Sequence, residues 1–298
     1  MRVGIIGLGD IAKKAYLPIL GTRAGIELKI ATRNVAVLHD IGERYRIPAR
    51  YSTVDALLEA GIDVAFVHVA TEAHMPVVKA LLQAGVHVYL DKPIANTYEE
   101  ARLLVQMAEQ RGCVLRIGFN RRFAPMYRQV KTNETPDLIV MQKNRTSLAG
   151  SPRSVIFDDF IHVIDTLRWL GMSTYDTLHV RWKMKGNELA HIVAQLSAKE
   201  HTAIGIMNRE SGLSEETLEV MRSGEKWIVR DLAELSHWRG AATVTKRSDW
   251  QNAYEARGFN AIVEDFFAAV SRGRDDLTRD MLDTHRVCEE IIRMIEEK

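Results

Sequence analysis

The stretch Gly7-Leu8-Gly9-Asp10-Ile11-Ala12 follows the apolar run Val3–Ile6 and precedes an amphipathic segment. It fits the pattern G-x-G-x-x-[G/A]. In that pattern the first glycine permits a tight turn, the second lets the backbone approach a pyrophosphate, and the small sixth residue allows close helix–strand packing. Free N–H groups at the helix start would face the negative charge. Because such a turn is also found without a ligand, the prediction depends on the flanking strand and helix. The stretch predicts a dinucleotide-binding loop, with Asp10 and Ile11 among the residues that contact the cofactor.

The rest of residues 1–118 alternates short apolar runs with longer amphipathic ones, which is typical of repeated βα units. Expected strands are Val3–Ile6, Leu28–Thr32, Val64–Val69, Val86–Leu90 and Val114–Ile117. Expected helices are Ala12–Leu20, Val35–Tyr45, Val54–Ala60, Met75–Ala84 and Tyr98–Gln110. Several apolar runs show no internal alternation, as strands covered on both faces do. We expect an α/β domain over residues 1–118, built as a Rossmann parallel sheet.

The pattern changes after about residue 120. A helical stretch, Ser154–Leu170, is followed by segments of strand character, and two helices, Phe259–Ser271 and Arg279–Glu296, close the chain. The expected strands are Thr177–Met184, Ala190–Leu196, Thr202–Met207, Thr217–Arg222 and Trp227–Arg230. Short polar turns join them, which favours an antiparallel or mixed sheet. We expect a substrate-binding α+β domain over residues 119–298, built on a mostly antiparallel open sheet.

Composition excludes several functional classes. The 298 residues suffice for two domains, with 46% hydrophobic and 27% charged residues. A formal net charge of +1 gives no overall attraction to nucleic acid or to an anionic membrane. No apolar run reaches the roughly 18 residues of a membrane span. Met1 leads directly into a strand-like run without signal-peptide character, and the chain has two cysteines. We therefore expect a protein of the reducing cytoplasm.

The end of the second expected strand bears on cofactor choice. An acidic side chain there would bind the ribose hydroxyls of NAD, but the sequence has Thr32, Arg33 and Asn34. This set would accommodate the 2′-phosphate of NADP. Arg33 as a solvated loop residue is the alternative. The sequence favours NADP, with NAD possible.

Further motifs resemble a known family. With the glycine loop, Thr71-Glu72-Ala73-His74 and Asp91-Lys92-Pro93 resemble the glucose–fructose oxidoreductase/inositol dehydrogenase (Gfo/Idh/MocA) family. The segments 118–125 and 158–165 resemble its MviM-like branch more narrowly. The family usually has Glu-Lys-Pro, so the carboxylate at Asp91 is one methylene shorter. It often has D-x-G-x-H on a helix, where this chain keeps the first and last residues but has Phe160 in place of the glycine.

The resemblance implies a catalytic set of Lys92, Asp158 and His162. Lys92 follows a strand at its carboxyl end, where ligands bind open α/β sheets. Asp158 and His162 are four residues apart and share a helix face. By resemblance to the family, Lys92 positions the reacting oxygen and His162 donates or accepts the proton. Asp158 binds a substrate hydroxyl or orients His162. The alternatives are a solvated lysine, a helix-surface pair and a core histidine. One histidine without further clustered ligands makes a catalytic metal unexpected.

Other candidates surround this set. By resemblance Thr71 and His74 lie beside the nicotinamide ribose, with Asp91 and Lys92 also near the cofactor; a helix cap is the alternative for Thr71. Substrate-binding candidates at the domain junction and the far wall of the cleft are Asn120, Arg121, Arg122, Tyr254 and Arg257. The double arginine either binds an anionic substrate group or forms interdomain salt bridges.

These features predict an NAD(P)-dependent dehydrogenase or reductase acting on the CH–OH group of a sugar, polyol or related small hydroxy/oxo compound. One alternative is a non-catalytic NAD(P)-binding sensor, since folds do not fix function. Another is an enzyme that retains its cofactor and catalyses a net non-redox reaction. A homo-oligomer is implied by the resemblance.

Overall fold

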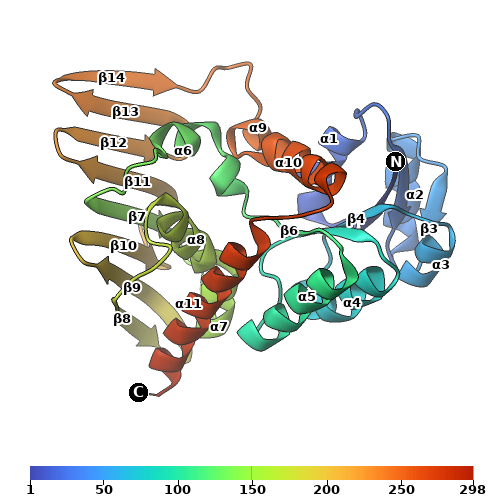
Figure 1. Cartoon of the computed structure of the whole chain (residues 1–298), viewed down its shortest axis with the longest axis horizontal. Coiled ribbons are helices and arrows are strands. Elements are labelled where there is room, and N and C mark those ends of the chain that lie inside the picture. Colours follow the sequence, from blue (N-terminus) through green and yellow to red (C-terminus); the bar gives the residue numbers. More distant parts are fainter. Residues whose placement is uncertain (149, 298) are drawn as a thin grey trace. The chain divides into compact units, whose positions relative to one another are not determined.

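The computed structural model describes residues 1–148 and 150–297. They form two compact units (Figure 1). The first comprises Met1–Gly118 and Phe259–Leu282, and the second comprises Phe119–Gly258 and the chain from Asp283 onward. Each unit has its own sheet and its own core.

The sheet of the first unit has six strands, all paired in parallel. They are β1 (Arg2–Ile6), β2 (Glu27–Ala31), β3 (Ala49–Tyr51), β4 (Val64–Val67), β5 (His87–Leu90) and β6 (Leu115–Ile117). Their order, β3-β2-β1-β4-β5-β6, places the reversal of strand order between β1 and β4. The predicted Rossmann sheet is confirmed. Only the three-residue β3 was not foreseen, because so short a run carries no periodicity.

Helices cover both faces of this sheet. They are a π-helical turn (Ala12–Tyr16) that continues into α1 (Leu17–Leu20), α2 (Val35–Arg44), α3 (Val54–Glu59), a 3-10 turn (Thr71–Ala73), α4 (His74–Gln83), α5 (Tyr98–Arg111), α10 (Phe259–Arg272) and the first residues of α11 (Thr278–Glu296). In Figure 1, α4 and α5 lie on one face, and α1 and α10 lie on the other. Side-chain caps from Asn34, Thr53 and Thr97 begin α2, α3 and α5.

Helix α10 differs from the expected division of the chain. We expected one domain from 119 to 298, but residues 259–282 pack with the first unit. The reason is apolar burial: the ring of Phe266 packs edge-on against Phe66 of β4, with 5.3 Å between ring centroids. Arg23 also pairs with Glu264 and lies over the ring of Phe267. Helix α10 therefore covers apolar side chains on this face of the first sheet.

The sheet of the second unit has eight strands. They are β7 (Leu138–Asn144), β8 (Thr177–Lys185), β9 (Glu188–Ala198), β10 (His201–Asn208), β11 (Glu215–Arg222), β12 (Glu225–Arg230), β13 (Glu234–Arg239) and β14 (Ala241–Lys246), in the order β14-β13-β12-β11-β7-β10-β9-β8. Only β7 and β10 pair in parallel. The predicted mostly antiparallel sheet is confirmed, although β7, β13 and β14 were missed. In β14 every residue is exposed, so no alternation marks the strand.

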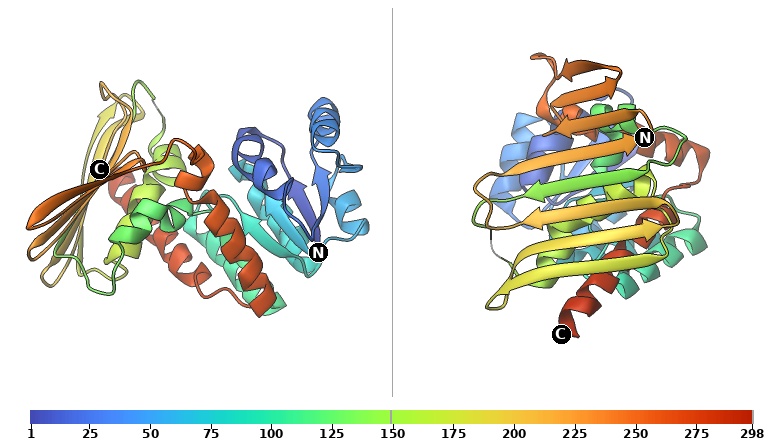
Figure 2. Two further views of the ribbon diagram at one scale, coloured as in Figure 1. Left: turned by 90° about the horizontal axis from the view of Figure 1, so that it is seen from above. Right: turned by 90° about the vertical axis from the view of Figure 1, so that its left-hand side faces the viewer.

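Helices lie on one face of this second sheet. They are α6 (Pro125–Val130), α7 (Pro152–Val155), α8 (Ile161–Leu170), α9 (Ala253–Ala256) and the remainder of α11, with a π-helical turn (Ile156–Phe160) joining α7 to α8. Figure 2 shows the other face, which no helix of the described residues crosses. Gly205 of β10 lets α8 approach closely, because a Cβ there would lie 2.8 Å from Val163 Cγ1. This contact fixes the helix that carries His162.

Two simple properties complete the fold. No helix in the described part of the chain combines the length and hydrophobicity that a bilayer span requires. Cys113 and Cys288 are both free thiols, and Cys288 is buried.

Candidate functional site

A cavity of about 650 Å³ lies at the carboxyl edge of the parallel sheet, beside the loops that follow β1, β2 and β4. Its lining residues are Ile6, Gly7, Leu8, Gly9, Lys13, Ala31, Thr32, Arg33, Asn34, Val37, Ser52, Thr53, Val54, His68, Val69, Ala70, Ala73 and Val77. The cavity thus spans the point where the strand order reverses, which is where open α/β sheets bind ligands. The predicted glycine loop forms one of its walls.

The two glycines of the loop have different roles. Gly7 has φ of +87°, and a Cβ there would lie 2.7 Å from the carbonyl carbon of His68. Any side chain would collide with backbone. At Gly9 an added Cβ would meet nothing within 4 Å, so the lack of a side chain there leaves open space at the cavity. Such an open backbone is suited to a bulky anionic group.

The remaining loop residues face elsewhere. Asp10 pairs with Lys14 at 2.7 Å, and both side chains are largely exposed. Ile11 is also exposed, and neither Asp10 nor Ile11 lines the cavity. Ala12 is fully buried at the helix start. Packing of the helix therefore depends on the small residue at position 12.

The electrostatic character of the cavity is positive. Its lining contains Lys13 and Arg33, and none of the lining residues is acidic. Arg33 is exposed and has no hydrogen bond or ion pair with the described residues. Asn34 is used differently, because its Oδ1 accepts the N–H of Val37 at 3.1 Å and caps α2. The free guanidinium of Arg33 is thus available to an anionic group.

The ring of His74 lies between two backbone segments. The ring is buried, with Nδ1 2.9 Å from the carbonyl oxygen of Pro93 and Nε2 3.2 Å from that of Val69. Burial lowers the pKa of His74, so the neutral ring donates only one hydrogen bond at neutral pH. Neither His74 nor Thr71 lines the cavity, and Thr71 makes no side-chain cap. His74 instead holds the segment after Lys92 against the loop after β4.

Asp91 belongs to a buried polar group that the sequence did not reveal. Its Oδ2 lies 2.7 Å from Nδ1 of His68, and its Oδ1 accepts the hydroxyl of Tyr16 at 3.1 Å. The Tyr16 ring stacks on His68 with centroids 4.1 Å apart, and its hydroxyl lies 2.8 Å from that of Tyr89. Burial and the charge of Asp91 raise the pKa of both tyrosines, which keeps them protonated. His68 follows β4 as Asp91 follows β5, and this shared position is the signal that sequence reasoning overlooked.

Lys92 lies in the first unit, directly after Asp91, and is half-buried. Asp158 and His162 belong to the second unit, on the helical stretch from Pro152 to Leu170. Asp158 is exposed and accepts the hydroxyl of Ser154 at 3.1 Å. His162 is buried, and Thr166 donates to its carbonyl oxygen at 2.8 Å.

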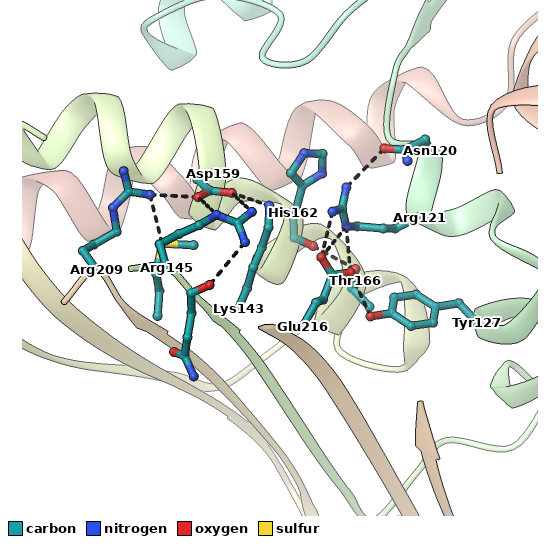
Figure 3. Close-up of polar contacts among 12 residues, drawn as sticks. Asn120, Arg121, Tyr127, Lys143, Arg145, Asp159, His162, Thr166, Arg209 and Glu216 are labelled. Atoms are coloured by element: carbon teal, nitrogen blue, oxygen red, sulfur yellow. Dashed lines mark hydrogen bonds and ion pairs between the residues drawn. The ribbon is translucent and has the colours of Figure 1, made fainter. Parts of the chain in front are cut away.

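The neighbouring carboxylate, Asp159, is the centre of a cationic cluster (Figure 3). Lys143 contacts Oδ1, Arg209 donates to Oδ2 at 2.8 Å, and Arg145 donates to both oxygens at 3.1 and 3.2 Å. In Figure 3, His162 of α8 lies close to Asp159, which belongs to the π-helical turn just before α8. Ile139, Met141 and Lys143 share the buried face of β7, but the run Leu138–Met141 is apolar at every position, so the sequence did not mark the inward lysine.

Arg121 is held by Glu216 of β11. Its Nη2 and Nε donate to the carboxylate at 2.7 and 2.9 Å, and Tyr127 donates to the same group at 3.0 Å (Figure 3). Burial opposes ionisation of Glu216, but the attraction of Arg121 lowers its pKa to about 2. Arg122 is paired in the same way with Asp165, at 2.6 Å. Both arginines therefore engage carboxylates of their own unit.

The remaining substrate-binding candidates lie close together in the second unit. Asn120 donates from Nδ2 to the carbonyl oxygen of Arg257 at 2.8 Å. Tyr254 is half-buried on α9, and the Arg257 side chain is exposed. Gly258, with φ of +84°, passes so close to Asn120 that an added Cβ would lie 2.5 Å from its carbonyl oxygen. No group of three His, Cys, Asp or Glu side chains with metal-binding geometry occurs in residues 1–148 and 150–297.

Known proteins resemble this chain in sequence and in fold. Residues 1–119 match the family model described as "Oxidoreductase family, NAD-binding Rossmann fold", and residues 125–240 match "YceM-like, C-terminal domain". YceM of Salmonella typhimurium is 37% identical over 278 residues, 91% of this chain and 89% of that protein. Myo-inositol dehydrogenase Hyg17 of Streptomyces leeuwenhoekii is 30% identical over 238 residues, 76% of this chain and 70% of that protein. The crystal structure of dehydrogenase MviM from Clostridium difficile has a TM-score of 0.93 and 30% identity, covering 99% of each chain.

Proposed function

Because this chain belongs to the Gfo/Idh/MocA family of oxidoreductases, we propose that it transfers a hydride between a nicotinamide cofactor and a small hydroxy/oxo compound. The observation that carries the proposal is the cavity of the first unit. It joins a glycine loop open at Gly9, cations at Lys13 and Arg33, and a lining without acidic residues. These features suit a dinucleotide that carries several phosphate charges.

The cofactor would be held by Gly7, Gly9 and the end of β2, and it supplies the hydride acceptor or donor when bound. Lys92 would hold the reacting oxygen and stabilise negative charge on it. His162 would take up or return the hydroxyl proton, because an imidazole titrates near neutral pH. Asp158 would bind a second hydroxyl of the substrate or orient His162. The position of Lys92 after β5, at the carboxyl edge of the sheet, supports its role.

We favour NADP over NAD as the cofactor. The support is Arg33, whose guanidinium has no partner within the described residues and lines the cavity beside Thr32 and Ser52. A 2′-phosphate at this place would gain a charge-assisted hydrogen bond. NAD lacks that group, so it would gain nothing from Arg33.

The substrate class is a sugar, polyol or related compound oxidised or reduced at a CH–OH carbon. The inositol dehydrogenase among the relatives supports this class. We also propose a cytoplasmic homo-oligomer. The two free thiols suit a reducing compartment. The open face of the second sheet carries half-buried apolar side chains, such as Val193, Ile204 and Ile206, which suit contact with a second copy.

The test is a screen of sugars, polyols and oxo acids for consumption of NADPH or formation from NADP⁺. If the protein is an oxidoreductase, at least one compound should be converted with stoichiometric turnover of the cofactor. A cofactor-retaining enzyme would convert substrate without net cofactor change, and a sensor would bind cofactor without converting anything.

Lys92→Ala then tests the catalytic assignment. Turnover should fall by roughly 100-fold or more, the size expected from removing a group that acts on the reacting oxygen. NADPH affinity should stay within a few-fold. Lys79→Ala, which removes an exposed lysine of the same unit, is the matched control and should keep full turnover. A near-wild-type rate in Lys92→Ala would remove Lys92 from the mechanism.

A further inference from the structure

The buried arginines and the Asp159 cluster differ in charge balance. Arg121 is matched one-to-one with Glu216, and Arg122 with Asp165. Asp159, in contrast, is shared by Lys143, Arg145 and Arg209. Three cations on one carboxylate leave an excess of positive charge on the helix-covered face of the second sheet.

This excess lies mostly out of water. Side-chain exposure is 3% for Lys143 and 7% for Arg209, and it rises to 27% for Arg145 at the rim. Asp158 lies near enough to influence Arg209 but is itself solvated, so it offsets the excess only in part. A buried charge without a full counter-charge is costly. A purely structural salt-bridge network would not need this imbalance.

Lys143 also has hydrogen-bonding capacity that the chain does not use. An ammonium group carries three N–H donors. Among the described residues its one acceptor is Asp159 Oδ1. Two donors on a side chain that is only 3% exposed therefore lack partners within residues 1–148 and 150–297. Figure 3 shows the ammonium beside Asp159, which lies on the same helical stretch as His162, the proposed proton-transfer residue.

The groups around Lys143 reinforce this picture. Burial and the charge of Arg121 lower the pKa of Lys143 to about 7, and Arg145 acts in the same direction. Asp159 and Glu216 oppose the shift but do not cancel it. An added anion would restore the balance.

We propose that Lys143, Arg145 and Arg209 receive an anionic group of the substrate, so that the substrate is a hydroxy or oxo compound bearing a carboxylate or phosphate. This inference rests on the proposed oxidoreductase function and narrows its substrate class. The unused donors of Lys143 and the cations around Asp159 would bind the anion oxygens by charge-assisted hydrogen bonds. Arg121 and Arg122, which the sequence suggested as anion-binding residues, already pair with Glu216 and Asp165. We therefore assign binding of the substrate anion to the cations around Asp159.

Calorimetric titration of the full chain with gluconate and with inorganic phosphate, at pH 8, tests the proposal. Sorbitol, a neutral polyol of similar size, is the ligand control. We expect gluconate or phosphate to bind and sorbitol to bind at least tenfold more weakly. Repeating the titration in two buffers of different ionisation enthalpy should reveal proton uptake, because the anion draws a proton onto Lys143. Whichever anion binds more tightly identifies the carboxylate or phosphate class.

Lys143→Met should abolish the proton uptake and weaken anion binding by roughly tenfold or more. The matched control is Lys185→Met, which removes an exposed lysine of the same unit paired with Glu210 and should change neither quantity. If Lys143→Met does not fold, Arg145→Gln at the rim replaces it and should also weaken binding. Equal anion affinity in wild type and folded variant, or no anion binding by wild type, would overturn the inference.

The outcome is separable from that of the general proposal. Oxidation of neutral polyols with NADP⁺, without anion binding, would overturn the anionic substrate and leave the oxidoreductase function standing. If the chain binds the anion but never turns over NADPH, the Asp159 cluster remains an anion-binding site and the oxidoreductase function is refuted.

Discussion

Lys143→Met should change how the stability of the second unit depends on pH. The pKa of Lys143 is lowered from 10.5 to about 7 in the folded chain. Between these values the unfolded state binds one more proton than the folded state, so stability rises with pH at up to about 1.4 kcal/mol per pH unit. Below pH 7 both states are protonated and the slope disappears. The full penalty for the charged lysine at low pH is on the order of 5 kcal/mol.

Urea unfolding followed by tryptophan fluorescence measures this effect in the second unit, which contains Lys143. All five tryptophans belong to the second unit: Trp169, Trp182, Trp227, Trp238 and Trp250. From pH 7.5 to 9.5 the unfolding free energy of wild type should rise by about 2–3 kcal/mol more than that of Lys143→Met. The variant should be the more stable protein at pH 7, because Asp159 keeps its arginine partners. Lys185→Met should follow wild type. Equal slopes in wild type and Lys143→Met would show that folding does not lower the pKa of Lys143.

Three other predictions concern the first unit. Arg33→Ala should weaken NADP binding by at least tenfold and NAD binding little, measured by fluorescence titration; equal losses would contradict the 2′-phosphate assignment. Gly7→Ala should abolish dinucleotide binding and lower the melting temperature, because its Cβ would lie 2.7 Å from the backbone of His68; unchanged NADPH affinity would show that the loop tolerates a side chain. His68→Leu should destabilise the chain by about 1–3 kcal/mol in urea unfolding, because the partly buried carboxylate of Asp91 loses a donor; stability equal to wild type would show that this pair contributes nothing.

The sequence predicted most of the fold because its signals are local. The buried runs of the first sheet lie between capped helices, so five of its strands could be located. The exposed β14 and the short β3 could not, since they are held by their neighbours in the sheet and not by their own pattern. The sequence placed α10 in the second domain, whereas it packs in the first unit. Its apolar face carries no information about which sheet it covers. That is decided by the partner surface at Phe66.

The candidate site was predictable where a motif occupies contiguous residues. The glycine loop and Arg33 meet at one cavity. The Asp91–His68–Tyr16 group and the Asp159 cluster join residues far apart in the chain, and local spacing does not encode such contacts. The inward position of Glu216 on β11 was nevertheless encoded by strand alternation, because it shares a face with Leu218 and Val220.

Deuterium transfer from the cofactor tests hydride transfer most directly. The chain is incubated with NADPH deuterated at C4 on either face and with the oxo compound found in the screen, and the product is examined by mass spectrometry. We expect one deuterium bound to the new CH–OH carbon from one face of the cofactor, with an equal amount of NADP⁺ formed. Product without deuterium from either face, or NADPH bound and never consumed, would contradict it.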